Sequence, residues 1–219
     1  MLQLYTYFRS SAAYRVRIAL HLKGLPFESV PVHLLQDGGQ QHGVAYAALN
    51  PAELVPMLVD DEPGSPITLP QSLAIIEYLD EQYPAVPLLP RDAAGRARVR
   101  ALALTVACDV HPLNNLRVLQ YLEHTLGQGG DARKAWVAHW VGLGFAALEA
   151  ELARSPATGR FCHGDAPTLA DCCLVPQWFN AERFKVPLDG YPTLARIVAA
   201  CRALSAFEQA APAAQPDAA

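Results

Sequence analysis

The sequence lacks long apolar runs, internal repeats and a strong charge bias. Its 219 residues contain no run of about eighteen apolar residues, so no segment is predicted to cross a membrane as a helix. No signal-peptide pattern precedes the first strand pattern, and we therefore expect a cytoplasmic protein without a membrane partner. The formal net charge is only -4, which gives no reason to expect nucleic acid as a partner.

Cysteine is scarce and its spacing does not suggest a metal site or a set of disulfides. The five cysteines are Cys108, Cys162, Cys172, Cys173 and Cys201, an odd number without a CxxC motif. Neither a disulfide framework nor a zinc site is indicated, and we expect no metal. Most of these side chains are expected to be small apolar residues of the core.

A strand followed by a helix opens the chain. Leu4–Phe8 is an apolar and aromatic run that is typical of a short buried strand. Apolar residues then recur every four positions from Tyr14 to Leu22, as on one face of a helix. Gly24 follows, a residue that commonly ends helices.

Arg9, Ser10 and Ser11 lie on the turn between this strand and this helix. The free N–H groups and the dipole of a helix N-terminus favour an anion at such a place. One serine alone would be interpreted as a helix cap. Two serines beside an arginine fit an anion or thiolate site as well as they fit a plain cap.

The rest of the first third alternates strand and helix signals. Strands are predicted over residues 26–32, 57–59 and 67–69, helices over 44–49 and 73–83, and a turn over 62–65. Ser72 is the predicted N-cap of the second of these helices, again at a place where an anion could bind. Pro56 precedes a strand, and statistics alone favour an ordinary trans bond before it.

A proline-rich connector, Pro84–Pro90, is the best candidate for a domain boundary. Beyond it the apolar periodicity is helical, and helices are predicted over residues 97–127, 132–153, 168–184 and 192–204. Pro112 should kink the first of them. The residues expected to face inward on the second are Trp136, Trp140, Leu143, Ala147 and Leu148. The tail over residues 210–219 is expected to be disordered.

Six motifs are spread over nearly the whole chain: YFRSSAAYRVRIAL, DGGQQ, ALNPAELVP, QSLAIIEYLDEQYP, GDAPTLADCCLVPQ and NAERFKV. Together they resemble the zeta class of soluble glutathione transferases, which contains maleylacetoacetate isomerase and the bacterial maleylpyruvate isomerase. The resemblance implies an α/β plus all-α fold, with a thioredoxin-like glutathione-binding domain over residues 1–84. An all-helical substrate domain would follow over residues 91–210.

The resemblance implies a glutathione site in the first domain. Gln71 and Ser72 would hold the γ-glutamyl group, because a serine and N–H groups at a helix start suit a carboxylate. Val55 would pair with the cysteinyl backbone, with Pro56 after it in the cis form. Gln41 matches a further glutathione contact on the loop after the second strand.

The thiol of glutathione would lie over the turn from Ser10 to Ala13, which includes Ser11, where a hydroxyl donor and the helix dipole favour thiolate. Ala12 stands where isomerases of this class often have a cysteine, in the motif SSCSWR. A covalent role for a protein cysteine at this position is therefore excluded, and glutathione itself would be the nucleophile.

The implied activity is cis–trans isomerisation of maleylacetoacetate or maleylpyruvate to the fumaryl product, by reversible addition of the thiolate. Such a substrate has two carboxylates, and Arg9 and Arg183 match the arginines that bind them in the family. Arg117 is a third candidate with a weaker claim. Without the resemblance, Arg183 would be interpreted as half of a surface ion pair, with Glu182 or Asp189.

The segment DVHPLNNLRVL, at residues 109–119, is closer to the bacterial maleylpyruvate isomerase than to eukaryotic members, which tend to have glutamine at position 111. His111 and Asn115 are predicted to lie one turn apart on one helix face. His111 taken alone suggests a surface or domain-interface residue. With the resemblance, His111, Asn115 and Arg117 are expected to contact glutathione or substrate, which favours maleylpyruvate slightly.

Two other functions remain open from the sequence. A transferase that conjugates glutathione to small α-halo acids, or dehalogenates them, would use the same glutathione site. A non-catalytic glutathione- or partner-binding module is the other, although the intact serines and arginines argue against it. The resemblance also implies a homodimer and a place in the breakdown of tyrosine or other aromatic compounds.

Overall fold

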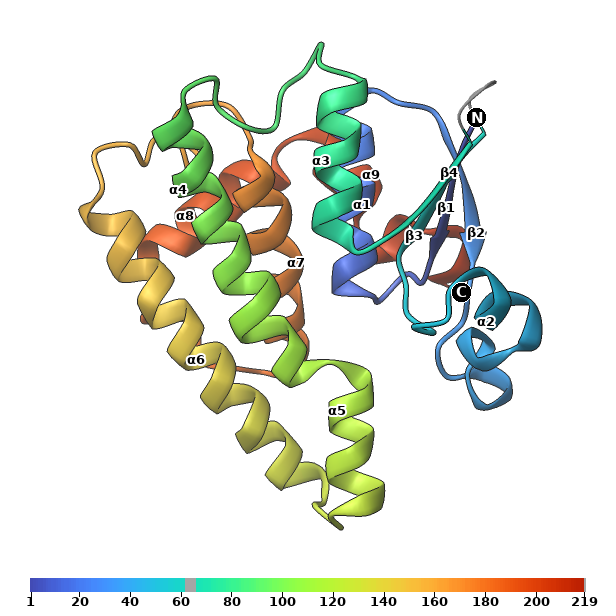
Figure 1. The fold of residues 1–219 in the computed structure, drawn as a ribbon. Coiled ribbons are helices and arrows are strands. Elements are labelled where there is room, and N and C mark those ends of the chain that lie inside the picture. Colours follow the sequence, from blue (N-terminus) through green and yellow to red (C-terminus); the bar gives the residue numbers. More distant parts are fainter. Residues whose placement is uncertain (62–65, 219) are drawn as a thin grey trace. The chain divides into compact units, whose positions relative to one another are not determined.

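The chain forms two compact units in the computed structural model, which describes residues 1–61 and 66–218 (Figure 1). Unit 1 comprises Met1–Leu88 together with Leu204–Ala219, and unit 2 comprises Leu89–Ala203. The turn expected over residues 62–65 lies outside the described residues. In the described part, no helix combines the length and apolar character needed to cross a bilayer.

Unit 1 is built on a four-stranded mixed sheet with the strand order β2-β1-β3-β4. The strands are β1 (Leu2–Thr6), β2 (Phe27–Pro31), β3 (Met57–Asp60) and β4 (Ile67–Pro70). β1 runs parallel to β2 and antiparallel to β3, which is antiparallel to β4. The parallel pair needs a crossover, and the helix predicted after the first strand provides it.

Three helices of unit 1 follow the sequence pattern closely. They are α1 (Ser11–Lys23), α2 (Val44–Leu49) and α3 (Ser72–Gln82). Gly24 ends α1 with the left-handed φ of 64° that glycine adopts without strain. α1 and α3 pack together beside the sheet, and α2 lies at its other side (Figure 1).

Two expectations for unit 1 are wrong in their limits. The first strand ends at Thr6 and not at Phe8, because the Ser10 N–H bonds to the Tyr7 carbonyl at 2.9 Å and closes a turn. The tail is ordered, and not disordered, over residues 210–218. It follows α9 (Ser205–Ala210), which packs on α1, and it forms two short turns of helix, η6 (Pro212–Ala214) and η7 (Pro216–Ala218). Residues 204–210, which we expected in the helical domain, therefore belong to unit 1.

All regular structure in the described residues of unit 2 is helical. The elements are α4 (Ala93–Leu104), η3 (Thr105–Val110), η4 (His111–Asn114), α5 (Leu116–Gln120), η5 (Tyr121–Thr125), α6 (Gly130–Arg154), α7 (Leu169–Arg183) and α8 (Pro192–Arg202). α7 contacts α4, α6 and α8 and is buried along most of its length. It is therefore the central helix of this unit.

The long helix predicted over residues 97–127 is interrupted and not merely kinked. A π-helical segment, η3, and a 3-10 segment, η4, follow α4, and Pro112 lies in η4, where its missing N–H breaks the α-helical bonding. Asn115 is extended, with φ -66° and ψ 149°, and starts α5 as its N-cap. His111 and Asn115 therefore do not share the face of one continuous helix.

The inward face predicted for the second long helix is wrong in part, since of the five residues expected there only Leu148 is fully buried. α6 buries Val137, Val141, Phe145, Leu148 and Leu152, whereas Leu143 is 55% exposed. Trp136 and Trp140 are only half-buried, and the Trp136 Nε1–H donates to the Leu113 carbonyl at 2.6 Å. Apolar residues occur on several sides of this helix, so its periodicity did not single out the buried one.

The prediction that most cysteines are core residues is confirmed. Cys162, Cys172, Cys173 and Cys201 are buried free thiols, and Cys108 is exposed. Burial raises the pKa of the Cys162 and Cys172 thiols well above their ordinary value, which makes both poor nucleophiles. No group of three or more potential metal ligands is found in the described part of the chain.

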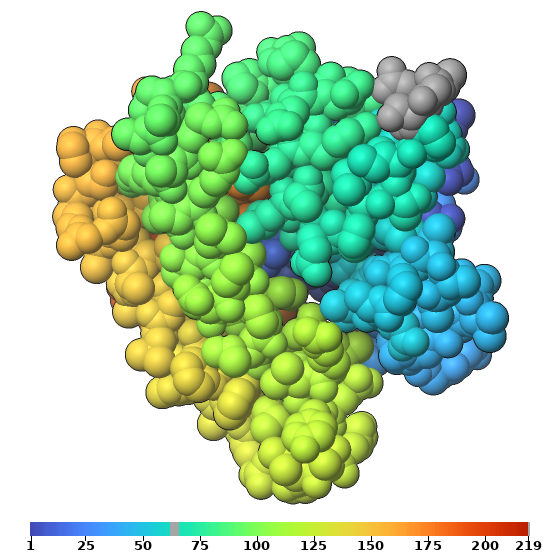
Figure 2. Space-filling model, in the orientation of Figure 1, coloured from blue at the N-terminus to red at the C-terminus, as the bar shows by residue number. Residues whose placement is uncertain are grey.

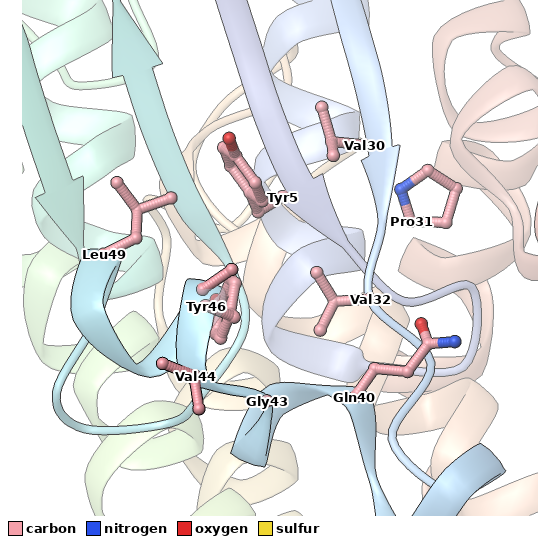
Figure 3. A pocket seen from close by; sticks show the side chains of 10 residues that line it. Tyr5, Val30, Pro31, Val32, Gln40, Gly43, Val44, Tyr46 and Leu49 are labelled. Carbon is pink, nitrogen blue, oxygen red and sulfur yellow. The ribbon is translucent and has the colours of Figure 1, made fainter.

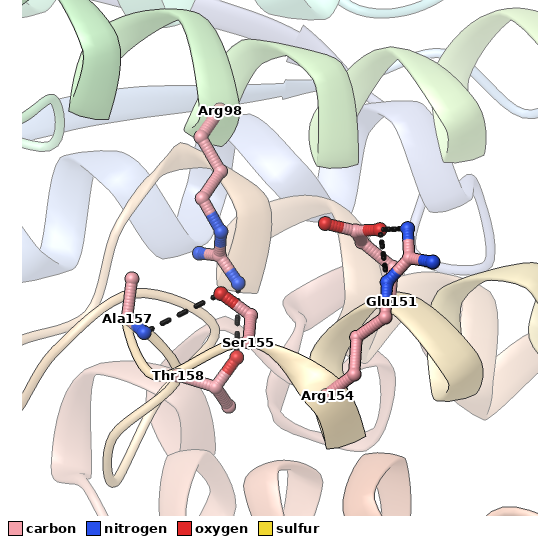
Figure 4. Close-up of polar contacts among 6 residues, drawn as sticks. All are labelled: Arg98, Glu151, Arg154, Ser155, Ala157 and Thr158. Atoms are coloured by element: carbon pink, nitrogen blue, oxygen red, sulfur yellow. Dashed lines mark hydrogen bonds and ion pairs between the residues drawn. The ribbon is translucent and has the colours of Figure 1, made fainter.

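The loop before α7 is fixed by buried polar groups. Asp171 is fully buried and accepts hydrogen bonds from the backbone N–H groups of Thr168 and Cys162, at 2.8 and 2.9 Å. Arg98 of α4 reaches the same loop, where its guanidinium donates to the Cys162 carbonyl at 2.8 Å. It also donates to the Thr158 hydroxyl at 2.9 Å (Figure 4). These bonds tie the start of the central helix to α4.

We expect Asp171→Ala to lower the free energy of unfolding by about 3 kcal/mol, because it removes a helix cap and leaves two buried N–H groups without an acceptor. Urea unfolding followed by circular dichroism measures this. Asp189→Ala is the control, since Asp189 is exposed in the same unit and its loss should change the free energy by less than about 0.5 kcal/mol. Equal effects of the two substitutions would contradict the assigned role of Asp171.

Candidate functional site

The turn between β1 and α1 presents a capping serine. Ser10 is the N-cap of α1, with extended backbone angles, and its Oγ accepts a hydrogen bond from the Ala13 N–H at 3.2 Å. Because Oγ acts as acceptor in this bond, its own hydrogen remains able to donate to a ligand. The structure thus gives Ser10 the capping role and keeps a donor at the helix N-terminus.

The other two polar residues of this turn differ in exposure. Ser11 is the first residue of α1 and only 5% exposed, whereas Ser10 is half-buried. Arg9 is exposed, and its guanidinium carbon lies 4.7 Å from the centre of the Phe8 ring, a cation–π contact. The turn therefore places one accessible hydroxyl and one accessible cation at the start of α1.

The start of α3 provides a second site for an anion. Gln71, and not Ser72 as we expected, is the N-cap, and its φ of 71° is uncommon for a residue other than glycine. Such strained residues concentrate at functional sites. Ser72 is the first helical residue and is 5% exposed, so it belongs to the helix start, where the first N–H groups have no partner within the helix.

A buried arginine lies beneath this second helix start. Arg15 of α1 is 3% exposed, and its Nη1 donates to the Ser72 Oγ at 3.1 Å. Sequence reasoning missed this residue, although it stands only five positions after Ser10 in the SSAAYR motif. Guanidinium charge, hydroxyl and helix dipole together make the start of α3 suitable for a carboxylate.

Side-chain hydrogen bonds fix the loop before β3. The Val55–Pro56 bond is cis, and the Leu54 carbonyl accepts hydrogen bonds from the Tyr46 hydroxyl at 2.6 Å and the Asn50 amide at 2.8 Å. Burial raises the pKa of Tyr46 to about 12, so its hydroxyl stays protonated and able to donate at neutral pH. These two bonds fix the backbone that leads into Val55.

Gln41 has an unused acceptor. It lies in η2 (Gln40–His42), is 7% exposed, and its Nε2 lies 2.9 Å from the His42 Nε2. Its Oε1 is buried and has no hydrogen-bond partner among the described residues. A buried acceptor of this kind normally has a hydrogen-bond partner. An N–H donor of a bound ligand would supply the bond that the Gln41 Oε1 lacks.

An apolar hollow of about 390 Å³ lies between α2 and the strands β1 and β2 (Figure 3). Its lining residues are Tyr5, Val30, Pro31, Val32, Gln40, Gly43, Val44, Ala45, Tyr46 and Leu49. None of the residues predicted to bind glutathione lines it. Val44 of α2 is 88% exposed, and Figure 2 shows this segment in blue as part of the surface of unit 1.

Four predicted site residues lie in unit 2. His111 begins η4 and is half-buried, and Asn115 caps α5 through an Oδ1 that accepts from the Arg117 N–H at 3.2 Å. Arg117 is exposed. Arg183 ends α7, is also exposed, and its guanidinium carbon lies 4.6 Å from the centre of the Phe184 ring. These residues come from two elements, the interrupted helix and the end of the central helix.

Glu182, which the sequence offered as an ion-pair partner for Arg183, is bound by two other residues. Both terminal guanidinium nitrogens of Arg202 donate to it, at 2.6 and 2.9 Å, and so does the Trp178 Nε1–H, at 2.9 Å. The Arg202 bonds help to hold the pKa of Glu182 below its ordinary value, although burial acts in the opposite direction. Glu182 thus has a cation of its own.

Sequence comparisons with known proteins agree on one family, the glutathione S-transferases. Residues 4–87 match the glutathione S-transferase N-terminal domain, and residues 135–207 match the glutathione S-transferase C-terminal domain. The probable maleylacetoacetate isomerase of Vibrio cholerae is 54% identical over 215 residues, which cover 98% of this chain and 97% of that protein.

Solved structures give the same result. The holo structure of a maleylpyruvate isomerase, a bacterial zeta-class glutathione S-transferase, matches with a TM-score of 0.93 and 52% identity, over 99% of this chain and 100% of that one. The maleylacetoacetate isomerase of Anaeromyxobacter dehalogenans, with glutathione bound in its active site, matches with a TM-score of 0.90 and 47% identity, over 100% and 98%.

We expect Ser10→Ala to lower the free energy of unfolding by about 1 kcal/mol, because the Ala13 N–H loses its acceptor. Urea unfolding measures the change. Ser205→Ala is the matched control, since Ser205 is exposed and follows the N-cap of α9. If both variants were as stable as the unmodified protein, Ser10 would not act as the cap.

Proposed function

The chain belongs to the zeta class of the glutathione S-transferase family, and on this premise we propose that it isomerises maleylacetoacetate or maleylpyruvate to the fumaryl product with glutathione as cofactor. The observation that carries the proposal is the extent of the similarity. Isomerases of both substrates match over 98% or more of the chain, so the site motifs are included in the match.

The residues of unit 1 fit glutathione. The start of α3, with Ser72 and the Arg15 guanidinium beneath it, suits the γ-glutamyl carboxylate, and Gln71 shapes this end. The unused Oε1 of Gln41 suits an N–H donor of the tripeptide. Val55, with Pro56 after it, offers a fixed stretch of backbone to the cysteinyl residue.

When bound, glutathione supplies a thiolate that adds reversibly to the activated alkene, so that the former double bond can rotate before the thiolate leaves. Ser10 would donate a hydrogen bond to the sulfur, and the N-terminus of α1, where Ser11 is the first residue, would add its dipole. Both effects lower the pKa of the thiol. The cofactor must supply this sulfur, because position 12 is alanine and the buried cysteines have raised pKa values.

Arginines hold the two carboxylates of the substrate. Arg9 and Arg183 are exposed, and a guanidinium can bind a carboxylate through two parallel hydrogen bonds. Their positive charge also stabilises the negative charge that develops on the substrate. His111, Asn115 and Arg117 are the proposed further contacts to glutathione or substrate from unit 2.

A spectrophotometric assay with maleylacetoacetate and maleylpyruvate, each with and without glutathione, tests the function. We expect turnover that requires glutathione without consuming it, and the ratio of the two rates identifies the preferred substrate. If glutathione binds and neither substrate reacts, the isomerase function is excluded. Conjugation or dehalogenation of small α-halo acids would then be the activity to test.

We expect Arg183→Lys to lower kcat/KM by about 30- to 1000-fold, because an ammonium group cannot reproduce the bidentate contact to a carboxylate. Arg154→Lys is the matched control, since Arg154 is exposed and pairs with Glu151 of its own helix (Figure 4). That variant should keep the full rate. A rate close to that of the unmodified enzyme in Arg183→Lys would remove Arg183 from the mechanism.

The proposal includes a cytoplasmic location and a homodimer. Free thiols at all five cysteines are typical of a reducing compartment. The dimer is supported by the family resemblance alone.

A further inference from the structure

The turn that carries Arg9 and Ser10 is held by two side chains from other parts of unit 1. Arg17 donates from Nη1 to the Tyr7 carbonyl at 3.3 Å and from Nη2 to the Phe8 carbonyl at 3.0 Å. The Phe8 N–H donates to the Asp217 Oδ2 at 2.9 Å. These bonds fix three backbone atoms just before the site residues.

Arg17 joins this turn to the C-terminal part of the chain. It is fully buried in α1, and its Nε donates to the carbonyl of Ala210, the last residue of α9, at 3.0 Å. Its Nη1 also donates to the Thr6 hydroxyl at 2.8 Å. Burial lowers the pKa of Arg17 to about 10, while Asp217 acts in the opposite direction, so the guanidinium stays charged at neutral pH.

The residues after α9 return to the turn along a defined path. The Gln215 Nε2 donates to the carbonyls of Gln209 and Ala211, at 2.9 and 3.0 Å, which folds the tail back on itself. Ala218 packs against the apolar cluster that contains Tyr7 and Phe8. The carboxylate of Asp217 is thereby carried to the turn, 209 residues away in sequence from Phe8.

One oxygen of the Asp217 carboxylate, Oδ1, is buried without a hydrogen-bond partner among the described residues, which is unfavourable for stability. A tail that served only to cover apolar surface would not need a partly desolvated carboxylate, because such a group lowers stability unless it is fully paired. The side chain is therefore better explained by what its other oxygen holds.

We propose that Asp217 is a positioning residue, which together with Arg17 holds the Tyr7–Ser10 turn in the geometry that aims the Ser10 hydroxyl at the cofactor sulfur. The inference rests on the proposed function in one respect, since it takes Ser10 as the donor to the thiol. Catalytic groups on a loop act well only if the loop is rigid, and small displacements cost large factors in rate. The C-terminal tail supplies that rigidity.

The test is the pKa of the glutathione thiol bound to the enzyme, measured by far-ultraviolet thiolate absorbance against pH without any substrate. Asp217→Ala should raise this pKa, so that the thiolate fraction at neutral pH and kcat/KM both fall by about 3- to 10-fold. Asp217→Asn should restore both nearly to normal, because its amide oxygen still accepts from the Phe8 N–H. Glutathione affinity, measured by calorimetry, should change little in either variant, since most of the contacts lie at other residues.

Glu208→Gln is the matched control, because Glu208 is an exposed acidic residue of α9, just before the tail, and should leave the thiol pKa unchanged. A chain ending at Pro216 gives a second route to the loss of Asp217 and should behave as Asp217→Ala does. If Asp217→Ala lowers the melting temperature without moving the thiol pKa, or if Asp217→Asn shifts that pKa equally, the proposal is overturned. Because no substrate enters the titration, a failed isomerase assay would leave this result intact.

Discussion

The buried guanidinium of Arg17 is the interaction on which unit 1 most depends. It satisfies the hydroxyl of Thr6 at the end of β1, two carbonyls of the turn that follows, and the carbonyl that ends α9. A charge in such a place is costly unless all its donors are used, because burial removes its hydration. The four bonds use four of the five N–H donors of the guanidinium and bring strand, turn, helix and tail into one arrangement.

A comparable arrangement stabilises unit 2. There the buried carboxylate of Asp171 accepts hydrogen bonds from the backbone N–H groups of Cys162 and Thr168. Arg98 donates hydrogen bonds to the same loop. Both units thus fix a loop next to a helix start with a buried ionisable side chain. In unit 1 that loop carries site residues, whereas in unit 2 it begins the central helix.

The chemistry requires positive potential more than acid–base groups. A thiolate, a γ-glutamyl carboxylate and two substrate carboxylates are all anions, and the proposed site meets them with helix N-termini, hydroxyl donors and arginines. Arg15 and Ser72 illustrate this, because the contact between them joins α1 to the start of α3. The same need explains why a cysteine at position 12 can be absent, since the nucleophile arrives with the cofactor.

The sequence by itself determined the strand–helix order of unit 1, the helical character of unit 2 and the family, because periodicity, caps and motifs are local properties. It also indicated that serines and arginines lie at helix starts. Only the tertiary structure revealed the order of the tail, whose alanine- and proline-rich composition carries no local signal. The same holds for the buried side of α6 and for the Arg15–Ser72 contact, between residues 57 apart. These features depend on which distant groups become neighbours after folding, and no pattern within a short window records that.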